Sequence, residues 1–192
     1  MLSDFLKKRH KKELELLKIV ETLEPLDIIA CTNPKSWISY FLRIRTNSDF
    51  SHVCLMGEHG TLFTTTIFGY QLKDAVSYLR KMNFVVYRHS EMDETKRRIG
   101  LISNYSMLDI PYGFFDVINL ITSMFKTGSR VKKLITNTDD YFCAEAVAYV
   151  YEEIGLKLLA HLGYHPSAMT PQNCIEDHKL FKVAGPHKAR LV

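Results

Sequence analysis

The sequence contains few of the residues that characterise fibrous, repetitive or disulfide-rich proteins. Its 192 residues include nine glycines, six prolines and four cysteines. With so little glycine and proline and no recurring period, collagen-like and repeat architectures are excluded. The four cysteines lie far apart and form no C-x-x-C pair, which argues against a structural zinc site or a disulfide framework and favours a reducing compartment.

Long apolar runs and a strong net charge are also missing. No stretch approaches the ~20 apolar residues of a membrane span, and the basic residues between positions 7 and 12 are not followed by an uninterrupted apolar segment. We therefore expect no transmembrane segment, no signal peptide, and a cytoplasmic or virion-associated protein. The net charge of +4 is too small to indicate nucleic acid as a partner.

The composition is that of one globular domain with an added helix. Hydrophobic residues make up 46% and charged residues 24% of the chain, which excludes wholesale disorder. Residues 1–24 predict a basic amphipathic helix, with Leu14, Leu17 and Val20 among its apolar positions. Its basic face is either simply solvated or binds an anionic surface or a larger assembly. Residues 25–192 form the main domain.

Helices and antiparallel hairpins are mixed along the main domain without a β-α-β rhythm, which indicates an α+β fold. A hairpin turn is expected at 58–60. The expected strands cover 26–30, 51–56, 61–68, 84–88 and 180–184, and the expected helices 35–43, 72–80, 91–108, 114–125 and 143–155. A basic loop, residues 126–137, precedes the last helix.

Cys143 is the residue whose position says most about chemistry. It opens the helix expected at 143–155, where free backbone N–H groups and the helix dipole favour a thiolate over a thiol. A thiolate is a nucleophile, so this position suits covalent catalysis. The alternative is a structural cysteine, because free cysteine is among the most buried residue types.

His52 is the histidine best placed to share the proton of such a thiol. It begins an apolar strand and lies on the same face as Cys54, although a histidine that belongs only to the core shows the same pattern. The expected hairpin brings Thr64 and Thr66 back beside His52, and either hydroxyl could orient the imidazole. The remaining histidines show no metal-binding spacing, so we expect neither a metal nor a cofactor.

Five segments, taken in order, resemble a known family. They are residues 25–29, 50–53, 110–113, 141–147 and 170–172. Together they resemble the circularly permuted, papain-like cysteine hydrolases of the NlpC-like superfamily, namely the YiiX-like group with its poxviral and phage relatives. In unpermuted relatives the cysteine helix precedes the histidine strand, whereas here His52 comes first. The resemblance spans about residues 25–184.

The resemblance implies an antiparallel sheet packed against the helix that begins at Cys143. It implies Cys143 as nucleophile and His52 as general base and acid, with Tyr112 and the backbone N–H of Cys143 at the oxyanion. The third position of the family is commonly Glu or another strong acceptor, and here it falls on Thr64 or Thr66.

The function that the resemblance implies is hydrolysis of an amide bond, in a cell-wall peptide or a related peptide or isopeptide, through a thiolate and an acyl-enzyme. Hydrolysis or transfer of a lipid acyl group is an alternative known in other branches. A different class of function is a catalytically weakened scaffold with a structural or partner-binding role. The weak acceptor at the third position and the basic helix over 1–24 favour that scaffold.

Overall fold

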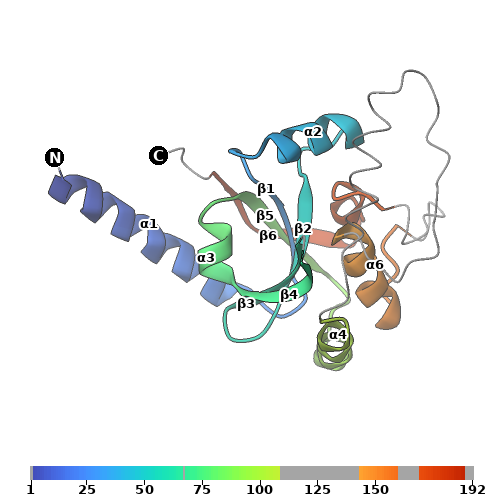
Figure 1. The fold of residues 1–192 in the computed structure, drawn as a ribbon. Coiled ribbons are helices and arrows are strands. Elements are labelled where there is room, and N and C mark those ends of the chain that lie inside the picture. Colours follow the sequence, from blue (N-terminus) through green and yellow to red (C-terminus); the bar gives the residue numbers. More distant parts are fainter. Residues whose placement is uncertain (1, 67, 109–142, 160–168, 189–192) are drawn as a thin grey trace, which may run out of the picture.

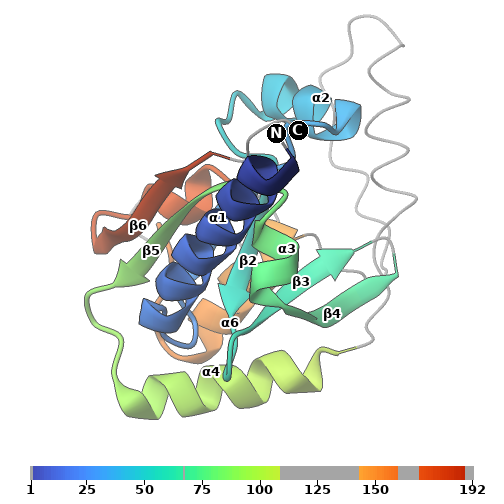
Figure 2. The same cartoon turned by 90° about the vertical axis from the view of Figure 1, so that its left-hand side faces the viewer.

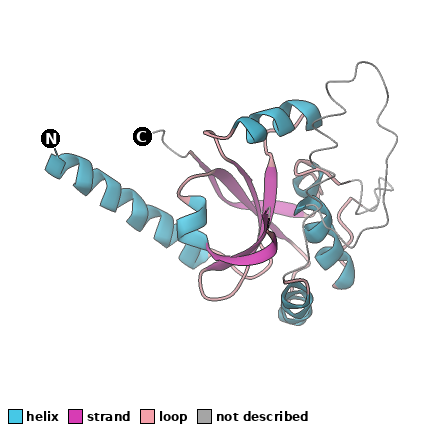
Figure 3. Ribbon diagram, in the orientation of Figure 1, coloured by secondary structure: helices cyan, strands magenta, loops and turns pink. Residues whose placement is uncertain are grey.

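The computed structural model describes residues 2–66, 68–108, 143–159 and 169–188, and Figures 1 and 3 show their arrangement. The elements are α1 (Leu2–Thr22), β1 (Ile28–Thr32), α2 (Trp37–Thr46), β2 (His52–Met56), β3 (Thr61–Thr66), β4 (Gly69–Asp74), α3 (Ala75–Leu79), β5 (Asn83–His89), α4 (Glu94–Ser106), α6 (Cys143–Glu153), the 3₁₀ turn η3 (Asn173–Ile175) and β6 (Leu180–His187). Among the helices described, none combines the length and apolarity needed to span a bilayer.

Six strands form one antiparallel sheet in the order β4-β3-β2-β1-β5-β6. All five residues of the central strand β1 are buried, which explains why its sequence is a continuous apolar run rather than an alternating one. The register pairs Ala30 with Val53 on one side and with Val85 on the other. The strand that carries His52 is therefore the direct neighbour of the central strand.

The two faces of the sheet carry separate hydrophobic clusters, because side chains alternate along each strand. In the first cluster, Ile28 and Val53 pack with residues of α4 and α6, including the fully buried Tyr151. In the second cluster, Ile29 and Cys54 pack with residues of α1 and α3. Figures 1 and 2 show α1 and α3 on one side of the sheet, and α4 and α6 on the other.

The C-terminal turns of α1 belong to the second cluster. Leu16 and Val20 are 2% and 4% exposed, whereas Leu14 and Leu17 remain largely open to solvent. The predicted helix over 1–24 is present over residues 2–22, and its buried stripe lies on the side that faces α3. A narrow apolar stripe on an otherwise charged helix is what its sequence predicts.

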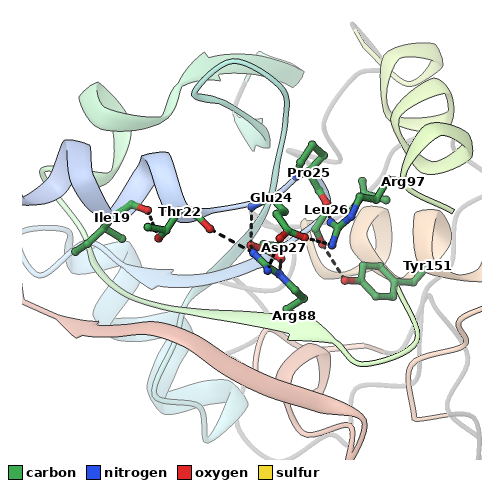
Figure 4. Close-up of polar contacts among 9 residues, drawn as sticks. All are labelled: Ile19, Thr22, Glu24, Pro25, Leu26, Asp27, Arg88, Arg97 and Tyr151. Atoms are coloured by element: carbon green, nitrogen blue, oxygen red, sulfur yellow. Dashed lines mark hydrogen bonds and ion pairs between the residues drawn. The ribbon is translucent and has the colours of Figure 1, made fainter. Parts of the chain in front are cut away.

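A buried carboxylate ties β1 to its neighbours (Figure 4). Asp27 lies just before β1 and its side chain is fully buried. Its carboxylate accepts hydrogen bonds from Nε and Nη2 of Arg88, on β5, at 2.7 and 2.8 Å, and from the backbone N–H of Glu24 at 2.9 Å. This bidentate pair joins the end of α1 to the centre of the sheet.

The same segment is held from the opposite face of the sheet (Figure 4). Arg97 of α4 hydrogen-bonds the carbonyl of Pro25 and the carboxylate of Glu24. Tyr151 of α6 donates its hydroxyl hydrogen to the carbonyl of Leu26 at 2.8 Å. Because α6 also carries Cys143, these contacts fix the cysteine helix relative to the sheet.

The predicted helix over 72–80 is wrong for residues 72–74, which end strand β4. Gly69, with a φ of 102°, turns the chain into β4, which pairs with β3 along its whole length. The helix starts only at Ala75, after the Asp74 carboxylate accepts the N–H of Ser77 at 2.7 Å. Strand pairing, a tertiary effect, outweighs the local pattern in this half-exposed segment.

The other described elements match their predicted positions to within a few residues. The α+β class is confirmed, with β4 as the one described strand that the sequence did not predict. α4 starts later than expected, at Glu94, because the Asp93 side chain caps it by accepting the N–H of Lys96. The expected helix over 114–125 and the basic loop over 126–137 lie outside the described residues.

Candidate active site

Cys143 is the first residue of α6. It is partly exposed, whereas the other three cysteines are buried. α6 packs against β2, and the thiol of Cys174 lies 3.6 Å from the carbonyl oxygen of Ala144. As the first residue of α6, Cys143 lies at a helix N-terminus, where backbone N–H groups have no intrahelical partner.

His52 is the first residue of β2, and a threonine orients its ring. Its Nε2 atom lies 2.7 Å from Oγ1 of Thr64, on β3. The preceding residue, Ser51, is buried, and its hydroxyl bonds Oγ1 of Thr32 at 2.9 Å and the hydroxyl of Ser39. These bonds fix the start of β2 to β1 and α2, so the imidazole extends from a rigid backbone.

The two threonines that the sequence leaves as alternatives have different partners. Thr64 is the one bonded to His52. Thr66 donates to the carbonyl of Gly69 at 3.2 Å and accepts the N–H of Phe68 at 3.1 Å, within the turn between β3 and β4. Tyr112, the expected oxyanion residue, lies outside the described residues.

His52 begins β2 within the sheet and Cys143 begins α6, which packs against β2. The start of β2 lies beyond the end of the β2–β3 ladder. This ladder ends at the pair formed by Leu55 and Phe63. Alternate amides of a strand point to opposite neighbours, so the N–H of Val53 points toward β3 where no ladder partner remains. That N–H acts on Cys143 and helps to lower the pKa of its thiol.

The electrostatics of the site favour a charged thiol–imidazole pair. Although burial raises it, the pKa of Cys143 lies below its usual value because the charge and hydrogen bond of His52, with the N–H of Val53, stabilise the thiolate. Although burial lowers it, the pKa of His52 lies well above its usual value because of the negative charges of Cys143 and Cys54. The two shifts have opposite signs, as expected when a thiolate and an imidazolium stabilise one another.

A second thiol competes for the same imidazole. Cys54 is 1% exposed. Although burial raises it, the pKa of Cys54 lies well below its usual value because of hydrogen bonds with Cys31 and His52 and the charge of His52. One imidazole takes up one proton, so a second thiolate would be an uncompensated buried charge. The helix N-terminus and the Val53 amide are available only to Cys143, and we assign the thiolate to Cys143 for that reason.

Sequence reasoning missed two side chains that contact Thr64. The Sγ atom of Cys54 and the Oη atom of Tyr78, on α3, each lie 3.3 Å from Oγ1 of Thr64. A signal for Cys54 exists, since it shares a strand face with His52. No local signal points to Tyr78, because its contact depends on how α3 lies across the sheet.

A cavity of about 280 Å³ lies between α2 and the segment around η3, and His52, Thr64 and Cys143 are not among its lining residues. Its lining residues are Tyr40, Arg43, Ile44, Asn47, Ser48, Asp49, Gln172 and Glu176. Amides, a hydroxyl and charges of both signs line the cavity, and such groups suit a polar, peptide-like ligand.

Replacing Thr64 with valine is expected to slow alkylation of Cys143 by iodoacetamide about tenfold near neutral pH. The variant keeps the shape of the side chain but removes the acceptor for the imidazolium, and a hydrogen bond to a charged group contributes about 1.5–3 kcal/mol. The matched control, Thr66→Val, is expected to change the rate less than about twofold, because Thr66 bonds only the turn at Gly69. Equal effects of the two variants would show that Thr64 does not orient His52.

In this α+β fold, a cysteine at the start of a helix and a histidine at the start of a strand shift the pKa values of one another. The fold is similar to that of the metalloprotein YiiX from Escherichia coli O157:H7, a DUF1105 protein, known from its crystal structure. The TM-score is 0.60 with 17% sequence identity, and the match covers 84% of this chain and 96% of that one. This similarity shows a YiiX-like fold. No family model and no curated protein matches the sequence.

The name of that structure raises the question of a metal site. Within the part of the chain that the structure describes, no group of three or more His, Cys, Asp or Glu side chains could hold a metal ion. The described residues therefore do not fit a metal centre, and we derive no step through one.

Proposed function

We propose that this chain is a cysteine hydrolase that cleaves an amide bond, with a permuted papain-like arrangement in which the histidine strand precedes the cysteine helix. One observation carries the proposal: Cys143, at the start of α6, interacts with an imidazole whose Nε2 is bonded by Thr64. A nucleophile, its base and an orienting group in one place are the parts that acyl transfer requires.

In the proposed reaction, Cys143 Sγ attacks the carbonyl carbon of the substrate and the carbonyl oxygen becomes an oxyanion. The backbone N–H of Cys143 and the hydroxyl of Tyr112 stabilise that oxyanion. The His52 imidazolium then protonates the leaving nitrogen as the C–N bond breaks, which leaves a thioester and a free amine. Water, deprotonated by His52, attacks the thioester, and the carboxylate product leaves as the thiolate–imidazolium pair forms again.

The proposed substrate is a peptide or isopeptide, with a cell-wall peptide as one member of that class. The polar cavity between α2 and the segment around η3 supports this choice. Arg43 and Glu176 supply opposite charges, and Gln172 supplies an amide that can pair with a peptide group. An acyl chain alone would offer no hydrogen-bond partner to any of these groups.

A lipid acyl group is the second candidate, and the surface of α2 favours it. Trp37, Tyr40 and Ile44 are 67%, 63% and 64% exposed and recur at helical spacing along α2. Exposed aromatic and aliphatic side chains on one helix face are typical of helices that lie on a bilayer surface. Tyr40 and Ile44 also line the cavity, so a lipid bound to α2 would lie close to it.

The test combines labelling with hydrolysis. Iodoacetamide, followed by mass spectrometry of the peptides, is expected to label Cys143 at least ~10-fold faster than Cys31, Cys54 and Cys174 at neutral pH. Purified protein is then given a peptide amide or phospholipid vesicles, and Cys143→Ser is expected to abolish turnover. Cys54→Ser, the matched control, keeps a hydrogen-bond donor beside Thr64 and is expected to keep whichever of the two activities the unsubstituted protein shows.

Each outcome decides between the candidates. Amide cleavage that depends on Cys143 supports the first proposal, and cleavage confined to the phospholipid supports the second. Faster labelling of Cys54 than of Cys143 would show that our proposal assigns the thiolate to the wrong residue. Slow labelling of all four cysteines, with no turnover, would leave the fold as a non-catalytic scaffold.

A further inference from the structure

The hydroxyl of Thr64 has three polar neighbours. Its Oγ1 atom lies 2.7 Å from Nε2 of His52, 3.3 Å from Sγ of Cys54 and 3.3 Å from Oη of Tyr78. His52 and Cys54 come from β2, whereas Tyr78 comes from α3, which lies across β2 and β3 in Figure 2. Thr64 itself is 1% exposed, so water does not compete freely for its hydroxyl.

A threonine hydroxyl donates one hydrogen and accepts two, which matches this set of neighbours. In the charged Cys143–His52 pair, Nε2 carries a hydrogen and must donate it to Thr64. The Cys54 thiol supplies a second donor. Both acceptor positions of Oγ1 are then filled, and the one hydrogen of Thr64 is left to donate to the hydroxyl oxygen of Tyr78.

We propose that Tyr78 is a positioning residue of this site: by accepting the hydrogen of Thr64, it holds Thr64 as an acceptor toward His52 and thereby favours the charged Cys143–His52 pair. This inference rests on the proposed roles of His52 and Cys143. In this arrangement, the hydroxyls of Thr64 and Tyr78 together take the place of the single carboxylate that commonly orients a catalytic histidine.

Removal of the Tyr78 hydroxyl has a defined chemical consequence. The hydrogen of Thr64 then loses its acceptor, and within the group the stronger of the remaining acceptors is the lone pair of His52 Nε2, since a thiol sulfur accepts only weakly. That lone pair exists only when the imidazole is neutral and carries its hydrogen on Nδ1. The substitution therefore stabilises the neutral state of His52 and leaves a buried hydroxyl hydrogen unpaired in the charged state.

The surroundings of Tyr78 keep it in the neutral form that this role needs. Burial raises the pKa of Tyr78 far above its usual value, with the negative charges of nearby thiols acting in the same direction. The titratable groups that act on His52 and Tyr78 are Cys31 on β1, Cys54 on β2 and Cys143 on α6. Tyr78 is thus a neutral hydroxyl across the range in which His52 and Cys143 exchange a proton.

The test is a double-mutant cycle on the full chain, read out as the alkylation rate of Cys143. Tyr78→Phe is expected to lower the rate about fivefold near neutral pH. In a Thr64→Val background, the same substitution is expected to change the rate less than about twofold, because Tyr78 acts only through Thr64. An equal effect in both backgrounds would overturn the proposal. Tyr105→Phe, on α4, is the matched loss of a hydroxyl and is expected to leave the rate unchanged.

A second measurement separates this proposal from the proposed function. Nitrogen-15 NMR of labelled histidine follows the protonation of His52 directly, between about pH 5 and 9. In a Cys143→Ala background, Tyr78→Phe is expected to lower the midpoint of His52 by about half a unit or more. That shift, seen alongside an unreactive Cys143 in the unsubstituted protein, would reject the hydrolase and retain the role of Tyr78. An unchanged midpoint would reject the role of Tyr78, whatever Cys143 does.

Discussion

Replacing His52 with alanine is expected to slow alkylation of Cys143 about 100-fold at pH 6. In the unsubstituted protein, the imidazolium stabilises the thiolate and holds the pKa of Cys143 below its usual value. Without it, burial and the usual thiol pKa of about 8.5 decide the thiolate fraction. At a pH below both values, each unit by which the pKa rises lowers that fraction about tenfold.

The shape of the pH profile tests the same prediction. Because the pKa of Cys143 is lowered and that of His52 is raised, the charged pair persists between the two values. Between the two pKa values, the alkylation rate of the unsubstituted protein is therefore expected to depend on pH less steeply than that of His52→Ala. The rate of His52→Ala is expected to rise about tenfold per pH unit until the thiol ionises, so the two profiles converge near pH 9.

His59→Ala is the matched control for that measurement. His59 lies in the turn between β2 and β3, with a φ of 51°, and the hydrogen bonds of that turn run through the backbone of its neighbours. The His59→Ala substitution is expected to leave the pH profile of Cys143 alkylation unchanged. A His52→Ala profile that coincides with that of the unsubstituted protein would show that the two side chains do not share a proton.

The positions of Cys143 and His52 in the fold could be predicted from the sequence because each has a local signal. Cys143 opens a helix with a clear apolar face, and His52 opens a short apolar strand that precedes a turn. Both elements are present as expected. Such signals depend only on neighbours within a few residues, and local periodicity is the part of structure that a single sequence encodes most directly.

The choice between Thr64 and Thr66 could not be made from the sequence, because the two residues share one face of the strand. The decision depends on where the β2–β3 ladder ends and where the chain turns at Gly69. Both are tertiary features. A one-residue change of register would exchange the faces of the strand, and the sequence alone does not fix the register.

The contacts of Tyr78 were hidden for a related reason. The pattern over 72–80 predicts one helix, whereas residues 69–74 form an edge strand and only 75–79 are helical. Because residues 69–74 form a strand, α3 begins later in the sequence than predicted, and its position against the sheet follows from the path of β4. A pattern of helical period cannot reveal which side chain then faces Thr64, since the contact joins elements from different parts of the fold.

Replacing Asp27 with alanine is expected to lower the free energy of unfolding by about 3–5 kcal/mol. The Asp27 carboxylate is fully buried and accepts three hydrogen bonds, two of them from Arg88. The substitution leaves the Arg88 guanidinium, which is only 18% exposed, without its main counter-ion. For a chain of this length, such a loss corresponds to a fall in melting temperature of about 10 °C, measured by circular dichroism.

Two controls show whether the loss comes from the unpaired charge. Glu24→Gln changes the exposed member of the same network, 47% open to solvent, and is expected to cost about 1 kcal/mol or less. Replacing both Asp27 and Arg88 with leucine and methionine, respectively, removes the pair together and is expected to cost less than Asp27→Ala alone. A double variant that is less stable than Asp27→Ala would contradict this account.

The position of Asp27 makes the same variant a probe of the active site. The segment that Asp27 anchors also accepts the hydroxyl hydrogen of Tyr151, eight residues after Cys143 on α6. Well below the melting temperature of the Asp27→Ala variant, iodoacetamide is therefore expected to alkylate its Cys143 a few-fold more slowly. The reason is that the cysteine helix is held less firmly against β2. An unchanged rate in the folded variant would show that α6 is positioned by its apolar contacts alone.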